Sequence, residues 1–219
     1  MDVTQDRIVE LAALHVPEDS RFFGGSFSTI VRVDESILDE RGEAAAAVHG
    51  ISKEEIAEGF IFPVAWRMFS DWLEAVLNAA ITASNDSDDD DPDSPRIASE
   101  PLHVLLVGHN AIRFDFPVLL AECYRNFLKT DCFEQWLFAD TLHIFQTGHG
   151  CCKLQCLVKD VYAPNELRAH RALDDVLALR RVVESAAQRL GVSLSMLLEL
   201  FAVSVDMPST LAQLAVLME

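Results

Sequence analysis

The chain has 219 residues and a formal net charge of −18, and half of its residues are hydrophobic, including 13 Phe and 3 Trp. This size and composition predict one globular domain with a substantial core and exclude a wholly disordered chain. No apolar run is long enough to span a bilayer, and the acidic charge argues against a surface that attracts nucleic acid everywhere.

The N-terminal residues and the cysteine spacing indicate in which cellular compartment the protein is expected. The first residues show no basic-then-apolar secretion signal, and the cysteine count of five is odd and lacks a framework spacing. We therefore expect reduced thiols in an intracellular protein of the nucleus or cytoplasm. A zinc site would need paired ligands with a second pair elsewhere, a pattern that the cysteines do not show. They are Cys123, Cys132, Cys151, Cys152 and Cys156.

The first predicted elements are two strands. Residues 7–16 form a largely apolar run typical of a buried strand, and residues 27–33 alternate more strongly. The pair Gly24-Gly25 precedes the second run, which predicts a β-hairpin.

Two helices are predicted next. Residues 54–57 follow Ser52, a good N-cap, and Glu55 completes a capping box. Residues 63–80 predict a long amphipathic helix, because apolar side chains recur there at every fourth position. These side chains are Val64, Met68, Trp72 and Val76.

An acidic tract interrupts the chain at about residues 84–99. Six acidic residues lie between Asp86 and Asp93, so the net charge without them is −12. The tract cannot bury apolar surface and its charges repel each other, which predicts a disordered surface insertion. The alternative is a calcium loop, but the Gly and terminal Glu of an EF-hand are absent.

The second half of the chain alternates strands and helices. Strands are predicted at 102–107 and 137–140, and helices at 116–127, from 141 to 145, and at 172–190. Strands followed by this alternation predict an α/β fold, with a mixed sheet flanked by helices.

The C-terminal residues contain two further apolar segments. Residues 194–205 and 209–218 are predicted helices separated by Pro208. We therefore expect a main domain at residues 1–190, which includes the acidic insertion, and a C-terminal helical extension at 191–219.

The most informative string is residues 107–117, VGHNAIRFDFP. It follows a strand and precedes a helix, so Asp115 is expected beyond the carboxyl end of a strand, where open α/β sheets bind ligands. A carboxylate at that place can bind a hard cation. The alternative is that Asp115 only caps the helix.

A second string, residues 170–176, combines a histidine with two aspartates. His170 is expected at or before the start of a helix, and Asp175 one turn inside it. This arrangement suits a general base on a loop beside a metal ligand on a rigid element. Asp174 and Asp175 are about 100° apart on a helix, so only one should face the site. Asp140, in a third string at a strand-to-helix junction, is better interpreted as an N-cap.

Together these strings resemble the DEDDh 3′→5′ exonuclease superfamily, which has a ribonuclease-H-like fold. The strings HNAIRFDFPVLLAEC and HRALDDVLAL are most similar to the three-prime repair exonuclease branch, and the resemblance runs from about residue 7 to residue 189. Such enzymes are hydrolases that bind two divalent cations, Mg²⁺ or Mn²⁺, with four acidic residues.

The resemblance assigns roles to individual residues. Asp115 and Asp175 correspond to metal ligands and His170 to the catalytic general base. His109 and Asn110 match positions beside the bound strand, and Arg113 is placed to touch a phosphate. The implied partner is a nucleic-acid 3′ end, with DNA favoured over RNA, and the branch also includes homodimers.

The family's first motif, Asp-x-Glu followed by Thr-Thr-Gly on its own strand, is absent from this sequence. Without two of the four acidic ligands, we expect a weak or inactive nuclease. Met1 occupies the place just after that motif, which suggests an internal methionine taken as a start. The alternative function is a catalytically dead exonuclease-like module that binds nucleic acid or a protein.

Overall fold

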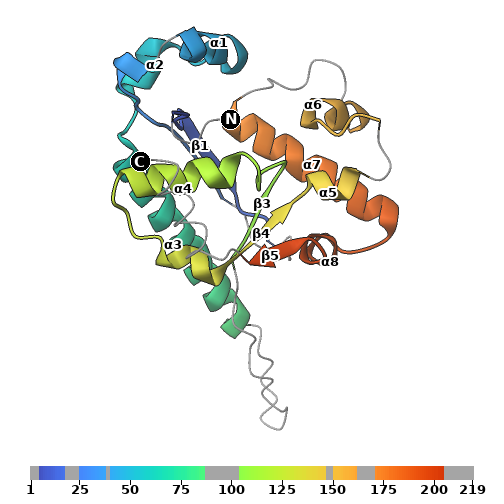
Figure 1. The fold of residues 1–219 in the computed structure, drawn as a ribbon. Coiled ribbons are helices and arrows are strands. Elements are labelled where there is room, and N and C mark those ends of the chain that lie inside the picture. Colours follow the sequence, from blue (N-terminus) through green and yellow to red (C-terminus); the bar gives the residue numbers. More distant parts are fainter. Residues whose placement is uncertain are drawn as a thin grey trace.

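The computed structural model describes residues 5–17, 25–37, 40–86, 104–146, 150–161 and 171–204. Helices surround two small sheets (Figure 1), so the predicted α/β class is confirmed. Within the described residues, no helix is long and apolar enough to cross a membrane.

The first sheet is the predicted hairpin. β1 (Glu10–Leu14) pairs antiparallel with β2 (Ser26–Ile30), with Ala12 opposite Ser28. The β-branched and apolar residues of both runs fit a pleated surface, and both observed strands are shorter than the predicted ones. The alternation of β2 places Phe27 and Thr29 inside and Ser26 and Ser28 outside.

The second sheet has the order β3-β4-β5. β3 (Val104–Gly108) runs parallel to β4 (Trp136–Asp140), and the short β5 (Ala202–Ser204) runs antiparallel to β4. The prediction of a continuous helix at 194–205 is therefore wrong. Its first part is α8 (Leu194–Glu199), but residues 202–204 extend the sheet instead, because they pair with the edge of β4. The predicted helix at 209–218 lies outside the described residues.

The two sheets face each other with unpaired edges. Val31 donates its N–H to the Val9 carbonyl (2.9 Å), so Val9 and Leu11 direct their backbone groups toward β2. In an antiparallel ladder this direction alternates, and the N–H and C=O groups of Ala12 and Leu14 therefore point to the other edge. Among the described residues, no strand pairs with that edge of β1 or with the free edge of β3.

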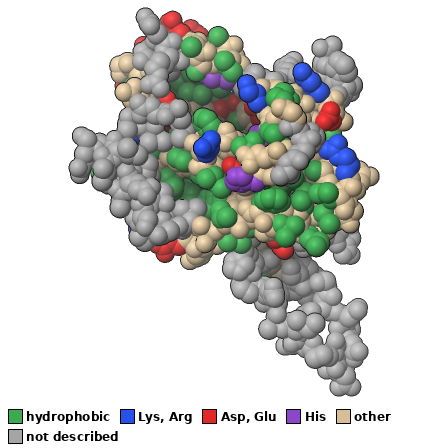
Figure 2. Space-filling model, turned by 45° about the vertical axis from the view of Figure 1, so that its right-hand side comes forward, with side chains coloured by type: hydrophobic (Ala, Val, Ile, Leu, Met, Phe, Trp, Pro, Cys, Tyr) green, Lys and Arg blue, Asp and Glu red, His purple; other side chains and the backbone are tan. Residues whose placement is uncertain are grey.

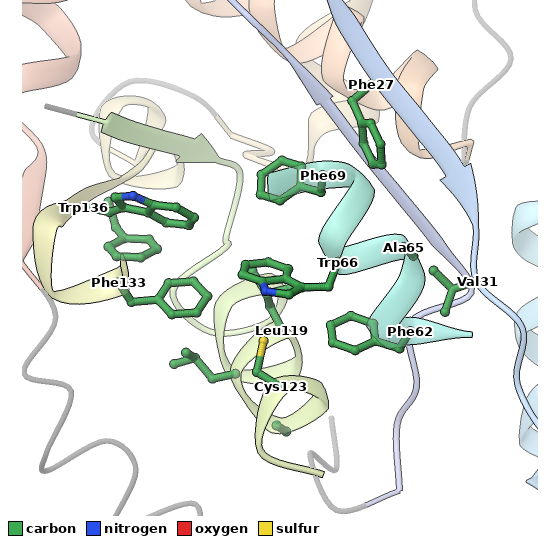
Figure 3. Packing of buried hydrophobic residues seen from close by; sticks show 13 residues of the cluster. Phe27, Val31, Phe62, Ala65, Trp66, Phe69, Leu119, Cys123, Phe133 and Trp136 are labelled. Atoms are coloured by element: carbon green, nitrogen blue, oxygen red, sulfur yellow. The ribbon is translucent and has the colours of Figure 1, made fainter. Parts of the chain in front are cut away.

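The core on the first face is built largely by α3 (Phe62–Asp86) and α4 (Asp115–Arg125). α3 buries Phe62, Ala65, Trp66 and Phe69 against the strands and α4 (Figure 3). Trp66 stacks on Phe133 with ring centroids 5.5 Å apart. The helix was predicted, and Trp72 of its predicted apolar face packs against this core, but two other members of that face do not.

α3 is rotated relative to the prediction, so that a partly different set of its side chains faces the core. Val64 and Met68, two members of the predicted face, are exposed, because the larger aromatic side chains one or two positions away occupy the interior. α3 also continues to Asp86, so the first residues of the predicted insertion are helical, and the rest of the insertion lies outside the described residues.

The remaining helices are short except for α7, which lies on the opposite face from α3. Leu11 and Ala13 of β1 pack on the α3 core, whereas Glu10 contacts the start of α7, and alternate side chains of a strand point to opposite faces. The predicted capping box at Ser52 and Glu55 is confirmed. The elements are η1 (Glu35–Ile37), α1 (Glu40–His49), α2 (Lys53–Glu58), α4 (Asp115–Arg125), η2 (Asp131–Gln135), α5 (Leu142–Phe145), α6 (Leu154–Leu157), η3 (Val158–Asp160) and α7 (Ala172–Leu190).

Candidate functional site

The candidate site begins with the turn after β3. A Cβ on Gly108 would lie 2.4 Å from the Cβ of Ala111, so the strand can end in this tight turn only with glycine at position 108. Asn110 has φ of 60°, a left-handed conformation that asparagine tolerates better than most residues. The turn connects the end of β3 at Gly108 to the start of α4 at Asp115.

Asp140, at the end of β4, holds this turn in place. Its Oδ1 accepts the N–H groups of Asn110 (2.7 Å) and Leu142 (2.9 Å), and its Oδ2 accepts that of Ile112 (3.2 Å). Asp140 is only 2% exposed. Because three backbone N–H groups share one carboxylate, the ends of β3 and β4 are fixed relative to each other. Asp140 is not the predicted N-cap, a position that Thr141 occupies in α5, but its hydrogen bonds give it a structural role.

Asp115 is the first residue of α4 and lies past the carboxyl end of β3, as predicted. It is not the N-cap, a position that Phe114 occupies without a side-chain bond. One side of Asp115 reaches solvent, but the protein atoms around its carboxyl displace water and raise its pKa. Its own backbone N–H opposes this effect, and the charges of Asp140 and Asp175 add to the increase.

The charge of Asp175 makes a small contribution to the raised pKa of Asp115, so the two carboxylates lie near enough to interact electrostatically. Asp175 lies one turn into α7, and 60 positions separate the two residues in the sequence. We call Asp115 and Asp175 the carboxylate pair. Asp174, its neighbour in sequence, does not contribute to the pKa of Asp115, in agreement with the prediction that only one of the two aspartates faces the site.

The start of α7 is fixed by a contact that the sequence analysis missed. Glu10 of β1 accepts the Ala172 N–H (2.8 Å) and pairs with Arg171 (3.1 Å). The Glu10 side chain is 8% exposed and that of Arg171 is 36% exposed, so the carboxylate is largely withdrawn from water while the guanidinium reaches solvent. Residue spacing could not have predicted this ion pair, because 161 positions separate Glu10 from Arg171 in the sequence.

This contact also gives the relative direction of the unpaired strands. Glu10 starts β1 and lies at the beginning of α7, one turn from Asp175, whereas Asp115 follows the end of β3. The start of β1 and the end of β3 therefore lie at the same end of the fold, and the two strands are antiparallel. A strand between them that ran parallel to β3 would end beside the carboxylate pair.

His109 is held by two internal hydrogen bonds. Its Nε2 lies 2.7 Å from the Cys152 carbonyl and its Nδ1 lies 2.9 Å from the Thr141 hydroxyl. A carbonyl only accepts, so Nε2 donates, and in the neutral ring Nδ1 accepts from Thr141. Thr141 is fully buried and was not predicted as part of the site.

A shallow hollow of about 370 Å³ lies beside the turn that leads into α4, and Asn110, Phe114 and residues 152–155 are among the residues that line it. The Oδ1 of Asn110 is buried and has no hydrogen-bond partner among the described residues, so it can accept a bond from a ligand. Arg113 is exposed beside this turn. On the face turned forward in Figure 2, Lys, Arg and His side chains are interspersed with apolar ones.

The metal-binding capacity of the described residues is limited. They contain no group of three or more His, Cys, Asp or Glu side chains that could hold a metal ion, and His170 lies outside them. Two converging carboxylates fit one hard cation that completes its shell with water, but they do not fit the two cations that the resemblance implies.

One prediction for this region is wrong. Cys151 and Cys156 form a disulfide, with Cα atoms 6.0 Å apart, so not all cysteines are reduced thiols. Cys123, Cys132 and Cys152 do not take part in a disulfide among the described residues. The spacing gave no signal for the pair, because the turn before α6 brings together two cysteines that a single extended or helical segment would separate.

No family model matches this sequence, and no curated protein matches it at a significant level.

Proposed function

We propose that this chain is the core of a metal-dependent 3′→5′ exonuclease of the DEDDh type, with DNA favoured as substrate. The observation that carries the proposal is the carboxylate pair. Asp115 and Asp175 lie in the first turns of different helices, and their charges interact past the end of β3, at the place where α/β folds bind ligands. The two motifs that carry Asp115 and Asp175 also occur in the order found in DEDDh exonucleases, and this resemblance supports the proposal together with the geometry.

The raised pKa of Asp115 supports cation binding. Two carboxylates close together in the absence of a cation repel each other and lose hydration, and a divalent cation relieves both costs. Asp115 and Asp175 would hold this ion, which supplies Lewis-acid stabilisation of the phosphate. Asn110 would accept a bond from the substrate, and Arg113 lies near enough in the turn to approach a phosphate.

The unpaired edges of β1 and β3 support the family assignment. In a ribonuclease-H-like sheet, the strand that carries Asp-x-Glu lies between the strands that correspond to β1 and β3. A strand with that direction would bring its two acidic residues beside Asp115 and Asp175. His170 directly precedes Arg171, which Glu10 fixes at the start of α7.

The test uses a 5′-labelled single-stranded DNA with Mn²⁺ or Mg²⁺, and an RNA of the same sequence as a second substrate. We expect slow shortening from the 3′ end in Mn²⁺, with release of nucleoside 5′-monophosphates. Asp175→Asn should abolish the shortening and weaken Mn²⁺ binding about tenfold or more, because it removes half of the ligand pair. Asp174→Asn is the matched control and should change neither quantity.

A catalytically dead binding module is the second candidate, favoured by the absence of a three-ligand metal group in the described residues. It predicts stable DNA binding without cleavage, at the same strength in the Asp175→Asn variant. If the wild-type chain bound neither Mn²⁺ nor DNA while folded, both candidates would be wrong.

A further inference from the structure

A short disulfide-closed loop forms one wall of the hollow. The four residues between Cys151 and Cys156 are Cys152, Lys153, Leu154 and Gln155, and all four line the hollow together with Asn110 and Phe114. We call residues 151–156 the disulfide loop. Lys153 lines the hollow, so the disulfide loop also contributes a positive charge to the surface that a ligand would contact.

The two ends of the disulfide loop are anchored differently. Cys156 belongs to α6, which is held by the buried Leu157 in the apolar cluster against α7. Cys151 is exposed and precedes the helix. The disulfide is therefore the covalent connection that ties the start of the loop to the anchored helix.

The loop in turn positions His109. The Cys152 carbonyl accepts the Nε2–H of His109 (2.7 Å), and the Cys152 thiol donates to the Phe145 carbonyl (3.3 Å). Both bonds require the backbone at position 152 to stay where the disulfide holds it. A change in the loop is thus transmitted directly to the turn that leads to Asp115.

We propose that the Cys151–Cys156 disulfide is a redox control of the hollow: the oxidised form holds a ligand-binding wall, and reduction loosens it and weakens nucleotide binding. The identity of the ligand rests on the proposed function. The oxidised loop has lost conformational freedom before a ligand arrives, so binding costs less entropy than in the reduced loop.

The reductant is a dithiol. One thiolate attacks Sγ of the exposed Cys151, the S–S bond breaks, and Cys156 leaves as a thiolate that takes up a proton. The second thiol of the reductant then attacks the mixed disulfide and releases Cys151 as a thiol. Two electrons pass to the protein, and the reductant leaves as its own disulfide.

The two described thiols outside the disulfide loop are less suited to this exchange. Burial raises the pKa of Cys123 to about 12, and it also raises the pKa of Cys132. Thiols with raised pKa values hold little thiolate at neutral pH and react slowly. Redox chemistry in this part of the chain should therefore be concentrated in the disulfide loop.

The experiment compares the oxidised protein, the protein reduced with dithiothreitol, and the double variant Cys151→Ser/Cys156→Ser, with Cys132→Ser as the control. Mass spectrometry verifies the redox state of each sample. Two properties are measured without ligand: amide hydrogen exchange at residues 152–155 and the imidazole NMR signals of His109. The affinity for thymidine 5′-monophosphate is then measured by titration with Mn²⁺ present.

We expect reduction to accelerate exchange at residues 152–155, shift the His109 signals and raise the Kd for the nucleotide about tenfold. The double variant should match the reduced protein under all conditions, and Cys132→Ser should match the wild type. Unchanged exchange and unchanged His109 signals in fully reduced protein would overturn the proposal, as would an unchanged Kd. If the nucleotide bound to neither form, the proposed ligand would be wrong, and the two ligand-free measurements would still decide the redox control.

Discussion

β3 and β4 are parallel neighbours of the same length, but only β4 has the surroundings of an interior strand. Four of its five residues are buried, and it pairs on both sides, with β3 and with β5. No residue of β3 is fully buried, and Val107 is 36% exposed. β1 is also only half-buried along its whole length.

This difference shows which sheet edges are left unpaired among the described residues. Parallel strands are normally covered on both faces and paired on both edges, because their unpaired backbone groups invite further pairing. β1 and β3 contact the same apolar core, run in opposite directions and each leave one edge unpaired among the described residues. A strand parallel to β3 would complete both edges and would end beside the carboxylate pair.

The largest predicted effect tests the contrast between the two strands directly. Phe138→Ala in β4 should lower the free energy of unfolding by about 3–5 kcal/mol, because it empties a fully enclosed site. Val107→Ala in β3 should cost less than about 1 kcal/mol, because part of that side chain is already in water. Urea unfolding measures both, and a loss of several kcal/mol for Val107→Ala would mean that β3 is an interior strand in solution.

A second prediction concerns the joint between the two strands. Asp140→Ala should cost about 3 kcal/mol, because the N–H groups of Asn110, Ile112 and Leu142 lose their acceptor. It should also weaken Mn²⁺ binding, since the turn before Asp115 is no longer held. Asp140→Asn keeps one oxygen acceptor and should lose less stability. Equal losses in the two variants would contradict the assigned hydrogen bonds.

The smallest predicted effect is a dependence of stability on pH at the end of β3. The folded state raises the pKa of Asp115, so the contribution of this group to stability is fully present below its unfolded pKa of about 3.9 and is lost as pH rises through the folded value. Asp115→Asn should therefore unfold at a higher temperature than the wild type at neutral pH, and the difference should shrink toward acidic pH.

Divalent cations should reverse this difference. Mg²⁺ or Mn²⁺ should stabilise the wild type and leave Asp115→Asn unchanged, because only the wild type has the complete carboxylate pair. Thermal melts over a pH series with and without the ion measure both effects. A variant that melts below the wild type at neutral pH without metal would contradict the assigned pKa shift.

The sequence predicted those features that depend on local patterns. The hairpin, the capping box at Ser52, the long α7 and the position of Asp115 after β3 follow from periodicity, capping residues and turn residues. The pairing of Asp115 with Asp175 was predicted from the order of the motifs. A joint role of the two residues in a metal site stays a prediction, and the structure adds only that the charge of Asp175 slightly raises the pKa of Asp115.

The features that the sequence did not show depend on contacts between distant segments. Residues 202–204 form a strand because β4 offers an edge, whereas the apolar run at residues 194–205 predicted one continuous helix. The Ala-rich α1 lacks the apolar periodicity that would have predicted it. The anchoring of α7 by Glu10 joins opposite ends of the chain, and no spacing rule reaches that far.

The most direct test of the account is to supply the strand. A five-residue β-strand that ends in Asp-x-Glu, joined through a tight turn to the segment before β1, matches the length of β3 and the direction that the gap requires. Hydrogen exchange at Ala12 and Leu14 and Mg²⁺-dependent shortening of a labelled DNA are measured with and without the added strand. We predict that the strand protects both amides and raises the cleavage rate at least about tenfold, and that changing its two acids to amides removes the cleavage but keeps the protection. If the amides of Ala12 and Leu14 were already as protected as those of Leu11 and Ala13 in the original chain, or gained no protection from the added strand, the account of an incomplete exonuclease sheet would be wrong.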